Sequence, residues 1–552
     1  MKKITIIALA FVLIGPSVLA QNKGVFSGNL QSFTSFFDRD DKIGANESPQ
    51  YFEQLSSAEA WLFMNYQVQG FNFSARYDIF NNSNLLNPTG NYSGHGIGFW
   101  QIRKEIGNLD ITAGSFYDQF GSGLVFRAYE QRLLGLDYAM EGLRVKYKIG
   151  NDFFIKGFTG RQKSNQISNR GDRFGTFPEI IMGLNAEKNL KISKKINANF
   201  GAAIIKRTIS EEEMTDIANI ISSYENTADK FDPKWNAYGY TAYTNLGIGK
   251  NLVLNGEYVG KTKEAYQNIN GKYELKPGKI ISTGFNFSKR KLGRNKKSSL
   301  GINAEFRQIE DFQFKISPRE ILLSGLMSYQ PSLTRQASYR LLARYNAPAQ
   351  EWGERGFKGG LTFSFKRGRT LSLNYSNVKR LDGEKLFKEH YAQYSHKFSK
   401  IFKAKMGLQT IFYNQQVYEG KGKEYDNVQT ITPFVDMTYK LNSRNSLRFE
   451  AQYMKTGQDL GSFANAILEL NMSPHYSFAI SDMVNTEPVR LGDEKNSNEI
   501  LHYYSIFAKY NIKTTSFTAA YIKQVEGVNC TGGICRLEPA FSGFRCSVIT
   551  NF

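Results

Sequence analysis

The sequence predicts an all-β protein, a single large antiparallel transmembrane β-barrel that follows an export signal. The chain has 552 residues with 42 Phe and 31 Tyr but only 13 Pro, a composition too aromatic for a disordered chain. No run of about 18 apolar residues follows position 20, which excludes a helical membrane protein. Three patterns predict the barrel: the N-terminal leader, repeated alternation of apolar and polar residues, and alternation of short and long links.

The N-terminus carries the pattern of a secretory signal peptide. Lys2 and Lys3 precede an apolar stretch over residues 4–14, and small residues lead to Ala20. A membrane anchor is disfavoured because the stretch is too short to span a bilayer and Gly15-Pro16 interrupts it. We therefore expect a signal peptide over residues 1–20 and a barrel over residues 21–552.

Many segments of about 9 to 13 residues alternate with period two, as expected of strands with one apolar face. One example sets apolar residues against polar or small ones: Leu300, Ile302, Ala304 and Phe306 against Gly301, Asn303, Glu305 and Arg307. Such strands are longer than those of soluble sandwiches. An apolar outer face on long strands is typical of a barrel wall that faces lipid.

The links between these segments predict the topology. Short links alternate with long ones, which matches the periplasmic turns and external loops of outer-membrane barrels. The links predict about 26 strands, with 22 or 24 also open, and an even number places both termini in the periplasm. This number requires residues 319–345 to form two strands. The first strand is expected near Val25, which disfavours a transporter with an N-terminal plug domain.

The last segment alternates toward a terminal aromatic residue. Phe544, Cys546, Val548 and Phe552 share one face, with Arg545 on the other. An aromatic end on a closing strand resembles the signal read by the barrel insertion machinery, so Phe552 is the predicted insertion signal.

The sequence resembles a family of uncharacterised, porin-like outer-membrane barrels of Bacteroidota. The likeness covers the mature chain and rests on the export signal, on residues 120–130 (FGSGLVFRAYE), and on residues 530–536 (CTGGICR) followed by 540–543 (AFSG). The resemblance implies a barrel in the outer membrane of a Gram-negative bacterium. It supplies no catalytic residues.

The long loop over residues 119–140 is a candidate pore constriction. It mixes large apolar residues with charges, and Gly121 and Gly123 would permit the chain to turn sharply back into the lumen. The candidate residues are Arg127, Glu130, Arg132 and Asp137. An external cap over the barrel mouth remains the alternative.

Basic residues are concentrated at positions predicted to line the lumen. The candidates are Arg144, Lys146, Arg307, Arg340, Arg344, Arg448 and Arg545. With Lys148 and Lys358 they make nine cations, against a single acid, Glu257, among the polar-face positions considered. Anionic solutes would therefore be favoured along a hydrated path. Pairing of these cations with a plug is the alternative.

The sequence carries no enzyme signature: it has no HExxH, no GxSxG and no phosphate-binding loop, and its five His are scattered. We therefore expect no catalytic residues, no metal site and no cofactor. No nucleic-acid-binding motif is present either. Cys530 and Cys535 flank two glycines in the last external loop, which predicts a local disulfide in an oxidising compartment.

These patterns predict a porin-like channel or transporter for small solutes, anionic ones among them. The alternative is a non-conducting barrel that serves as a scaffold or subunit of a larger envelope complex for secretion or assembly. Expected partners are outer-membrane lipid and lipopolysaccharide, the insertion machinery, and small anionic solutes or periplasmic proteins.

Overall fold

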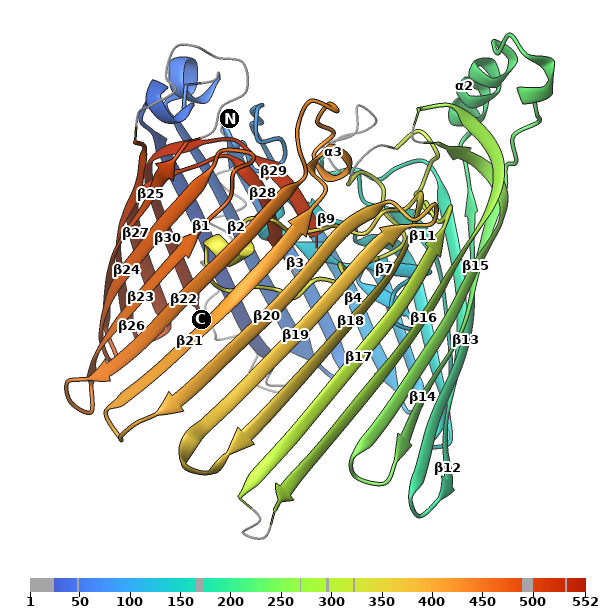
Figure 1. The fold of residues 1–552 in the computed structure, drawn as a ribbon. Helices are drawn as coiled ribbons and strands as arrows, with labels where there is room; N and C mark the ends of the chain where they lie inside the picture. The colour runs from blue at the N-terminus through green and yellow to red at the C-terminus, as the bar shows by residue number, and fades with distance from the viewer. Residues whose placement is uncertain are drawn as a thin grey trace, which may run out of the picture.

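The computed structural model is a closed antiparallel β-barrel of 24 strands (Figure 1). It describes residues 24–46, 49–164, 173–268, 270–293, 297–320, 323–488, 500–531 and 534–552. Neighbouring strands pair in chain order, and the last strand pairs with the first to close the ring. The predicted fold class is confirmed, with 24 strands, an open alternative, in place of 26.

The barrel wall consists of long strands. They are β1 (Val25–Phe37), β2 (Ser56–Val68), β3 (Phe71–Asn81), β4 (Gly94–Ile106), β5 (Leu109–Phe116), β10 (Met140–Ile149), β11 (Phe153–Gln162), β12 (Ile180–Ser193), β13 (Ile196–Thr208), β14 (Asn236–Ile248), β15 (Leu252–Gln267), β16 (Tyr273–Leu292), β17 (Ser298–Glu310), β18 (Gly353–Phe365), β19 (Arg369–Arg380), β20 (Lys385–Lys397), β21 (Phe402–Tyr413), β22 (Val428–Lys440), β23 (Asn445–Met454), β24 (Ser462–Met472), β25 (Tyr476–Glu487), β26 (His502–Ile512), β27 (Thr515–Gln524) and β30 (Phe541–Asn551).

The remaining elements lie in the connections. They are η1 (Asp41–Ile43), η2 (Gln50–Gln54), β6 (Asp118–Phe120), β7 (Phe126–Ala128), β8 (Glu130–Gln131), η3 (Arg132–Leu134), β9 (Leu136–Asp137), α2 (Glu211–Ser222), η4 (Thr227–Asp229), η5 (Leu341–Ala343), η6 (Lys366–Gly368), α3 (Gln415–Tyr418), β28 (Gly527–Thr531) and β29 (Ile534–Glu538).

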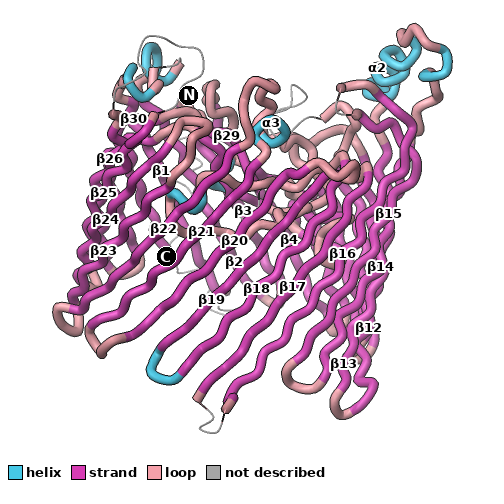
Figure 2. Tube along the Cα trace, in the orientation of Figure 1, coloured by secondary structure: helices cyan, strands magenta, loops and turns pink. Residues whose placement is uncertain are grey.

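The two ends of the barrel differ in their connections (Figure 2). Every second connection is a turn of a few residues, and these turns share one end, here called the short-turn end. The other end, the long-loop end, carries the long connections, including the projecting helix α2. No helix in the described ranges is long and apolar enough to cross a membrane.

The period-two pattern sets the two faces of the wall. In β17, Arg307 and Ile309 are buried inside the barrel, so Ile302, Ala304 and Phe306 point outward, as the alternation predicts. The closing strand β30 continues to Phe552, whose backbone N–H and carbonyl both bond to Gly28 at 3.0 and 2.8 Å.

The segment between β17 and β18 contradicts the sequence prediction. Residues 319–345 were expected to form two wall strands, but β17 pairs directly with β18, and the described part of this segment contains only the short helix η5. The described residues between them, 311–320 and 323–352, instead lie inside the barrel. This one difference accounts for the change from 26 strands to 24.

Helix α2 begins where its sequence favours a helix start. The Ser210 hydroxyl accepts a bond from the Glu213 N–H at 3.3 Å, and Glu211, Glu212 and Glu213 place negative charge in the first turn.

Candidate functional site

The loop between β5 and β10 runs into the lumen, and we call residues 117–139 the first inward segment. Phe120, Val125 and Phe126 are fully buried in one cluster with wall residues of the neighbouring strands. The rings of Phe126 and Phe158, from β11, lie 4.8 Å apart. The segment therefore packs against the inner wall.

Two glycines form the turn of this segment. Gly121 and Gly123 have φ of +56° and +96°, conformations that favour glycine. A Cβ on Gly121 would lie 2.6 Å from the Glu257 carboxylate, which accepts a 3.0 Å bond from the Ser122 N–H. The turn is thus tied to β15 on the wall.

A buried ionic cluster anchors the end of the first inward segment. The Arg76 guanidinium of β3 lies 2.6 Å from Asp78, 2.7 Å from Glu130 and 2.8 Å from Asp137. Lys163 lies 3.0 Å from Asp137. Because Asp137 and Glu130 belong to the segment and Arg76 to the wall, this cluster holds the segment in the lumen.

Neighbouring cations stabilise the ionised form of Asp137. Burial alone raises the pKa of this carboxyl, but the cations Lys163, Arg76 and Arg173 outweigh it and hold the pKa well below its usual range. The Tyr117 hydroxyl also donates to Asp137 at 2.9 Å. Asp137 therefore remains ionised while it is buried.

The other two candidate constriction residues have different surroundings. Arg132 lies 2.6 Å from Glu130 and donates to the Gln31 side chain at 2.8 Å. The Arg127 guanidinium lies 4.1 Å from the ring centre of Tyr329 and 5.0 Å from that of Tyr129. Aromatic faces attract a cation, so Arg127 is held without an ion pair among the described residues.

Residues 311–320 and 323–352 form the second inward segment, which lies directly against the first. The Arg127 N–H donates to the Met327 carbonyl at 2.8 Å, and the Tyr329 N–H donates to the Gly123 carbonyl at 3.0 Å. Phe312, Phe314 and Ile316 are fully buried in the same cluster as Phe126. The two segments thus form one packed body.

The later part of the second segment reaches the opposite wall. The Leu341 N–H donates to Gln452 of β23 at 2.8 Å, and Gln409 of β21 donates to the Leu342 carbonyl at 3.2 Å. The Tyr339 hydroxyl donates to Asp436 of β22 at 3.0 Å. The segment therefore bridges the lumen.

A second ionic cluster holds the later part of the second inward segment near the long-loop end. Asp459 lies 3.1 Å from Arg344 and 2.9 Å from Lys421, and it accepts a 2.9 Å bond from the Tyr345 hydroxyl. Burial acts to raise the pKa of Asp459, but Arg344 and Lys421 lower it to about 2. Asp459 lies in the loop between β23 and β24, outside the wall strands.

Two apolar clusters surround the inward segments. One joins the first segment and the start of the second to strands from β5 to β17. The other joins Leu333, Leu341 and Tyr345 to strands from β19 to β27 and to β30 and β1. We call these two clusters together the apolar layer, and they lie in the long-loop half of the barrel.

Four of the cations predicted to line the lumen are paired with acids. Arg144 lies 2.5 Å from Asp118, Arg307 lies 3.6 Å from Glu354, Arg344 lies 3.1 Å from Asp459, and Arg448 lies 3.1 Å from Asp436. Arg340 and Arg344 belong to the second inward segment instead of the wall. Ion pairs therefore offset four of the nine cations that were counted from the sequence.

Three of the candidate lining residues have no ion pair among the described residues. Lys146 lies 3.9 Å from the ring centre of Phe154, and Arg545 lies 3.8 Å from that of Phe541. Arg340 precedes η5. Lys148 and Lys358 have no ion pair among the described residues either, so these five are the predicted lumen cations whose charge is not offset by a paired acid.

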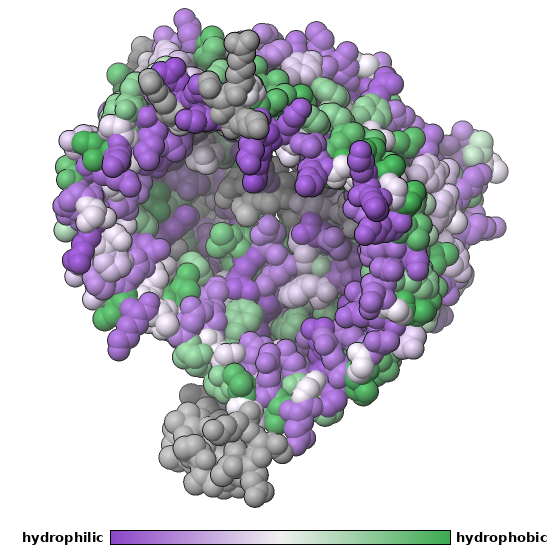
Figure 3. All heavy atoms as spheres, turned by 90° about the horizontal axis from the view of Figure 1, so that it is seen from below, coloured by the Kyte–Doolittle hydropathy of each residue, from purple (hydrophilic) through white to green (hydrophobic). Residues whose placement is uncertain are grey.

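The short-turn half of the barrel is hollow and mainly hydrophilic (Figure 3). Its strands carry uncharged polar side chains that bond across neighbouring strands, such as Ser481 to Ser505 at 2.8 Å and Thr518 to Ser547 at 2.6 Å. A polar cavity open at this end therefore meets the apolar layer above it.

Sequence reasoning missed Arg76 and Lys163, which anchor the first segment. Arg76 and Asp78 alternate on the polar face of one strand, a signal that was present in the sequence. The signal peptide lies outside the described residues, as do the side chains of Cys530 and Cys535, although their backbones are opposite each other in the β28–β29 hairpin. The disulfide and the roles of Phe552 and the constriction residues stay predictions.

The whole chain, residues 1–552, matches the model of a protein family described as "Family of unknown function (DUF6029)". The chain belongs to this family. No curated protein matches the sequence.

Several solved structures are similar to the chain at low identity. The P pilus usher (PapC) translocation pore is 10% identical with a TM-score of 0.43, and the match covers 96% of this chain and 99% of that one. The ferric-catecholate import receptor Fiu of E. coli K12 is 9% identical with a TM-score of 0.39, covering 95% and 81%. Acinetobacter baumannii OccAB3 is 10% identical with a TM-score of 0.37, covering 96% and 99%.

Proposed function

We propose that the protein is a gated channel or transporter for small polar solutes in the outer membrane of a Gram-negative bacterium. The observation that carries this proposal is that two loop segments, and no wall strand, occupy the lumen. All 24 wall strands pair with each other without the two inward segments, so these segments can move while the barrel stays intact.

The width of the lumen supports a channel that opens only when the inward segments move. A wide barrel needs a plug to hold back solutes, since barrels of more than 20 strands enclose a lumen too large for side chains to fill. The hydrophilic cavity at the short-turn end gives solutes a hydrated approach, and the apolar layer above it is the gate.

Conductance in planar bilayers tests the gate. Leu341 is 2% exposed, so Leu341→Asp places a carboxylate in the apolar layer and drives the second segment out of its site. We expect frequent openings from this variant and rare ones from the wild type. Leu133→Asp is the matched control, because Leu133 is 64% exposed and tolerates the same change.

A preference for anions, if the open path has one, is proposed to come from Lys146, Arg340 and Arg545. Their charges have no paired acid in the described ranges, unlike those of Arg144 or Arg448. Reversal potentials of Leu341→Asp with and without Arg545→Gln test this, with Lys423→Gln on an external loop as the control. Equal reversal potentials for all three proteins would contradict it.

A second candidate is the non-conducting scaffold or complex subunit. The apolar layer favours it, because a barrel that never opens needs such a layer permanently. A folded Leu341→Asp barrel that conducts no more than the wild type would favour this second candidate over the gated channel.

A further inference from the structure

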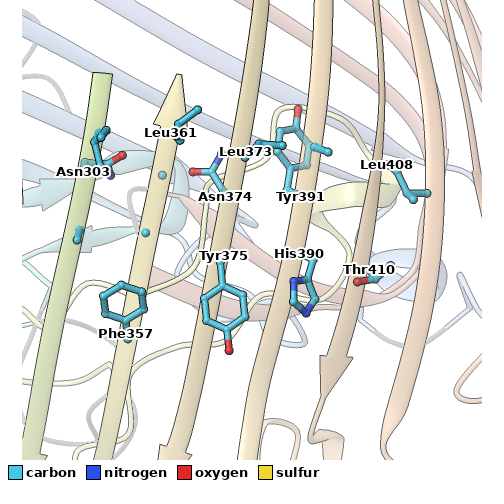
Figure 4. Close-up of a pocket in the computed structure, with 15 residues that line it drawn as sticks. Asn303, Phe357, Leu361, Leu373, Asn374, Tyr375, His390, Tyr391, Leu408 and Thr410 are labelled. Atoms are coloured by element: carbon cyan, nitrogen blue, oxygen red, sulfur yellow. The ribbon is translucent and has the colours of Figure 1, made fainter. Parts of the chain in front are cut away.

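The outer face of the barrel wall is hollowed across strands β17–β21. A groove of about 560 Å³ is lined there by Phe357, Leu361, Leu373, Tyr375, His390 and Leu408, among others. We call it the outer groove. Figure 4 shows Phe357, Tyr375, His390 and Thr410 in one row across neighbouring strands. These side chains alternate with buried ones such as Glu354, Val378 and Glu389, so they face outward, toward lipid.

Small side chains create this groove. Ala304 pairs with Gly359, which pairs with Tyr375, and Ala392 pairs with Leu373 and Leu408. A Cβ on Gly359 would lie 3.3 Å from the edge of the Phe357 ring and 3.8 Å from the Asn303 carbonyl oxygen. The hollow is therefore a gap between large residues, open on the membrane side.

Four cations stand beyond the groove at the long-loop end. Arg355 pairs with Lys379 in register, Lys379 pairs with Lys385 beside a bulge, and Lys388 lies opposite Asn377. We call Arg355, Lys379, Lys385 and Lys388 the rim cations. Like charges directly opposite each other on a sheet repel, so this arrangement lacks a counter-charge of its own.

Three acids at the same end of these strands already have partners. Glu310 lies 2.9 Å from Lys279, and Glu384 lies 2.9 Å from Arg380, which also lies 3.6 Å from Asp382. In the described part of the chain no ion pair involves a rim cation. The patch therefore carries a net positive charge.

The rim cations and the groove share one face of the same strands. Arg355 is two residues from Phe357, and Lys388 is two residues from His390, so each is one outward position beyond the groove. This separation along a strand is about 7 Å. A molecule with acyl chains in the groove would present its headgroup to the cations.

We propose that the outer groove and the rim cations bind the lipid A part of lipopolysaccharide. An acyl chain would occupy the groove, and a lipid A phosphate would bind between the rim cations through charge-assisted hydrogen bonds. The proposal rests on the proposed outer-membrane location, because only there does the long-loop end face the leaflet that holds this lipid.

Lipid titrations of the purified barrel in detergent micelles test the site. The probes are diphosphorylated lipid A, its dephosphorylated form and phosphatidylglycerol, and bound lipid is counted by native mass spectrometry. Each Lys or Arg near an anionic lipid contributes a factor of about five. Replacing Arg355, Lys379 and Lys388 with Gln should therefore weaken lipid A binding roughly a hundredfold.

A groove variant separates the two halves of the site. Gly359→Leu fills the hollow and should weaken both forms of lipid A, while the Gln variant should weaken only the phosphorylated form. Lys206→Gln removes a single outward cation of β13 at the same end and should change neither. Heat-modifiable migration in gels confirms that each variant is folded.

Three results would overturn the site: a Gln variant that binds like the wild type, a Lys206→Gln effect of equal size, or phosphatidylglycerol bound as tightly as lipid A. The proposed transport role fails separately, because a barrel that never conducts but binds lipid A through these residues leaves the site intact. Absence of the protein from outer-membrane fractions would overturn both the location and this site.

Discussion

The buried ionic cluster around Asp137 should decide whether the first inward segment stays in the lumen. Three cations, Arg76, Lys163 and Arg173, act on Asp137, while Asp78 and Glu130 share Arg76. Asp137→Asn keeps the shape of the side chain but leaves one cation without a counter-charge. Removing one partner of a buried pair costs about 3 to 5 kcal/mol.

The expected cost lies at the low end of that range because Arg76 retains Asp78 and Glu130. A loss of about 3 kcal/mol raises the population with the segment released by roughly a hundredfold. Trypsin cleaves after Arg127 and Arg132 only when they leave the lumen, and proteolysis tracks the open population when opening is fast. Cleavage at these two sites should therefore accelerate by about that factor.

The control is Asp41→Asn, which removes an ion pair of the same kind at the exposed side chains of Arg39 and Asp41. It should leave cleavage in the first segment unchanged. Gel migration before and after boiling checks that both barrels are intact. If folded Asp137→Asn is cleaved at the wild-type rate, the ionic cluster does not hold the segment, and the reasoning is refuted.

Three further predictions concern other regions. Asp459 has a lowered pKa of about 2, so its ionised form stabilises the second segment above about pH 4. This contribution, about 2 kcal/mol, is lost as pH falls toward 2. Pepsin cleavage of the segment should therefore rise over that pH range, and Asp459→Asn should remove this pH dependence. Cys530 and Cys535 should be joined, leaving Cys546 free, and recovery of both loop thiols unlinked by peptide mass mapping would contradict this. Deletion of Phe552 should reduce assembly of the barrel at the cell surface, as measured by surface labelling, and normal assembly would show that the residue is dispensable.

The barrel could be predicted from sequence because its wall obeys a local rule. Each wall strand shows its own alternation, and Ile302 and Phe306 point outward in the structure as their spacing requires. The strand number failed because an even count of 26 required residues 319–345 to form two wall strands, whereas β17 pairs directly with β18. The second inward segment also places apolar residues at alternate positions, Phe312, Phe314 and Ile316, but these pack against the inner wall instead of lipid.

The site could be predicted only in part because it depends on long-range register. The first inward segment was recognised as a candidate from its glycines and mixed charges, and the structure places it in the lumen. Its anchors were not found, since Arg76 and Lys163 are far from Asp137 in the chain. The acids that pair with Arg307 and Arg448 were missed for the same reason, because pairing depends on strand register. A one-residue change of register would have turned these acids to the other face of the wall.

The contacts of the two inward segments bear on how the lumen would open. The first segment is fastened to the wall by ion pairs around Arg76 and by apolar packing of Phe120 and Phe126. The second is held by apolar contacts of Leu333 and Leu341 and by the cluster at Asp459. The two segments also bond to each other through Arg127 and Met327. Because of that bond, release of one segment weakens the hold on the other, so the lumen should open in one cooperative step. Opening in two independent steps would require the contacts between the segments to contribute nothing, although Phe126 and Phe314 lie in one fully buried cluster.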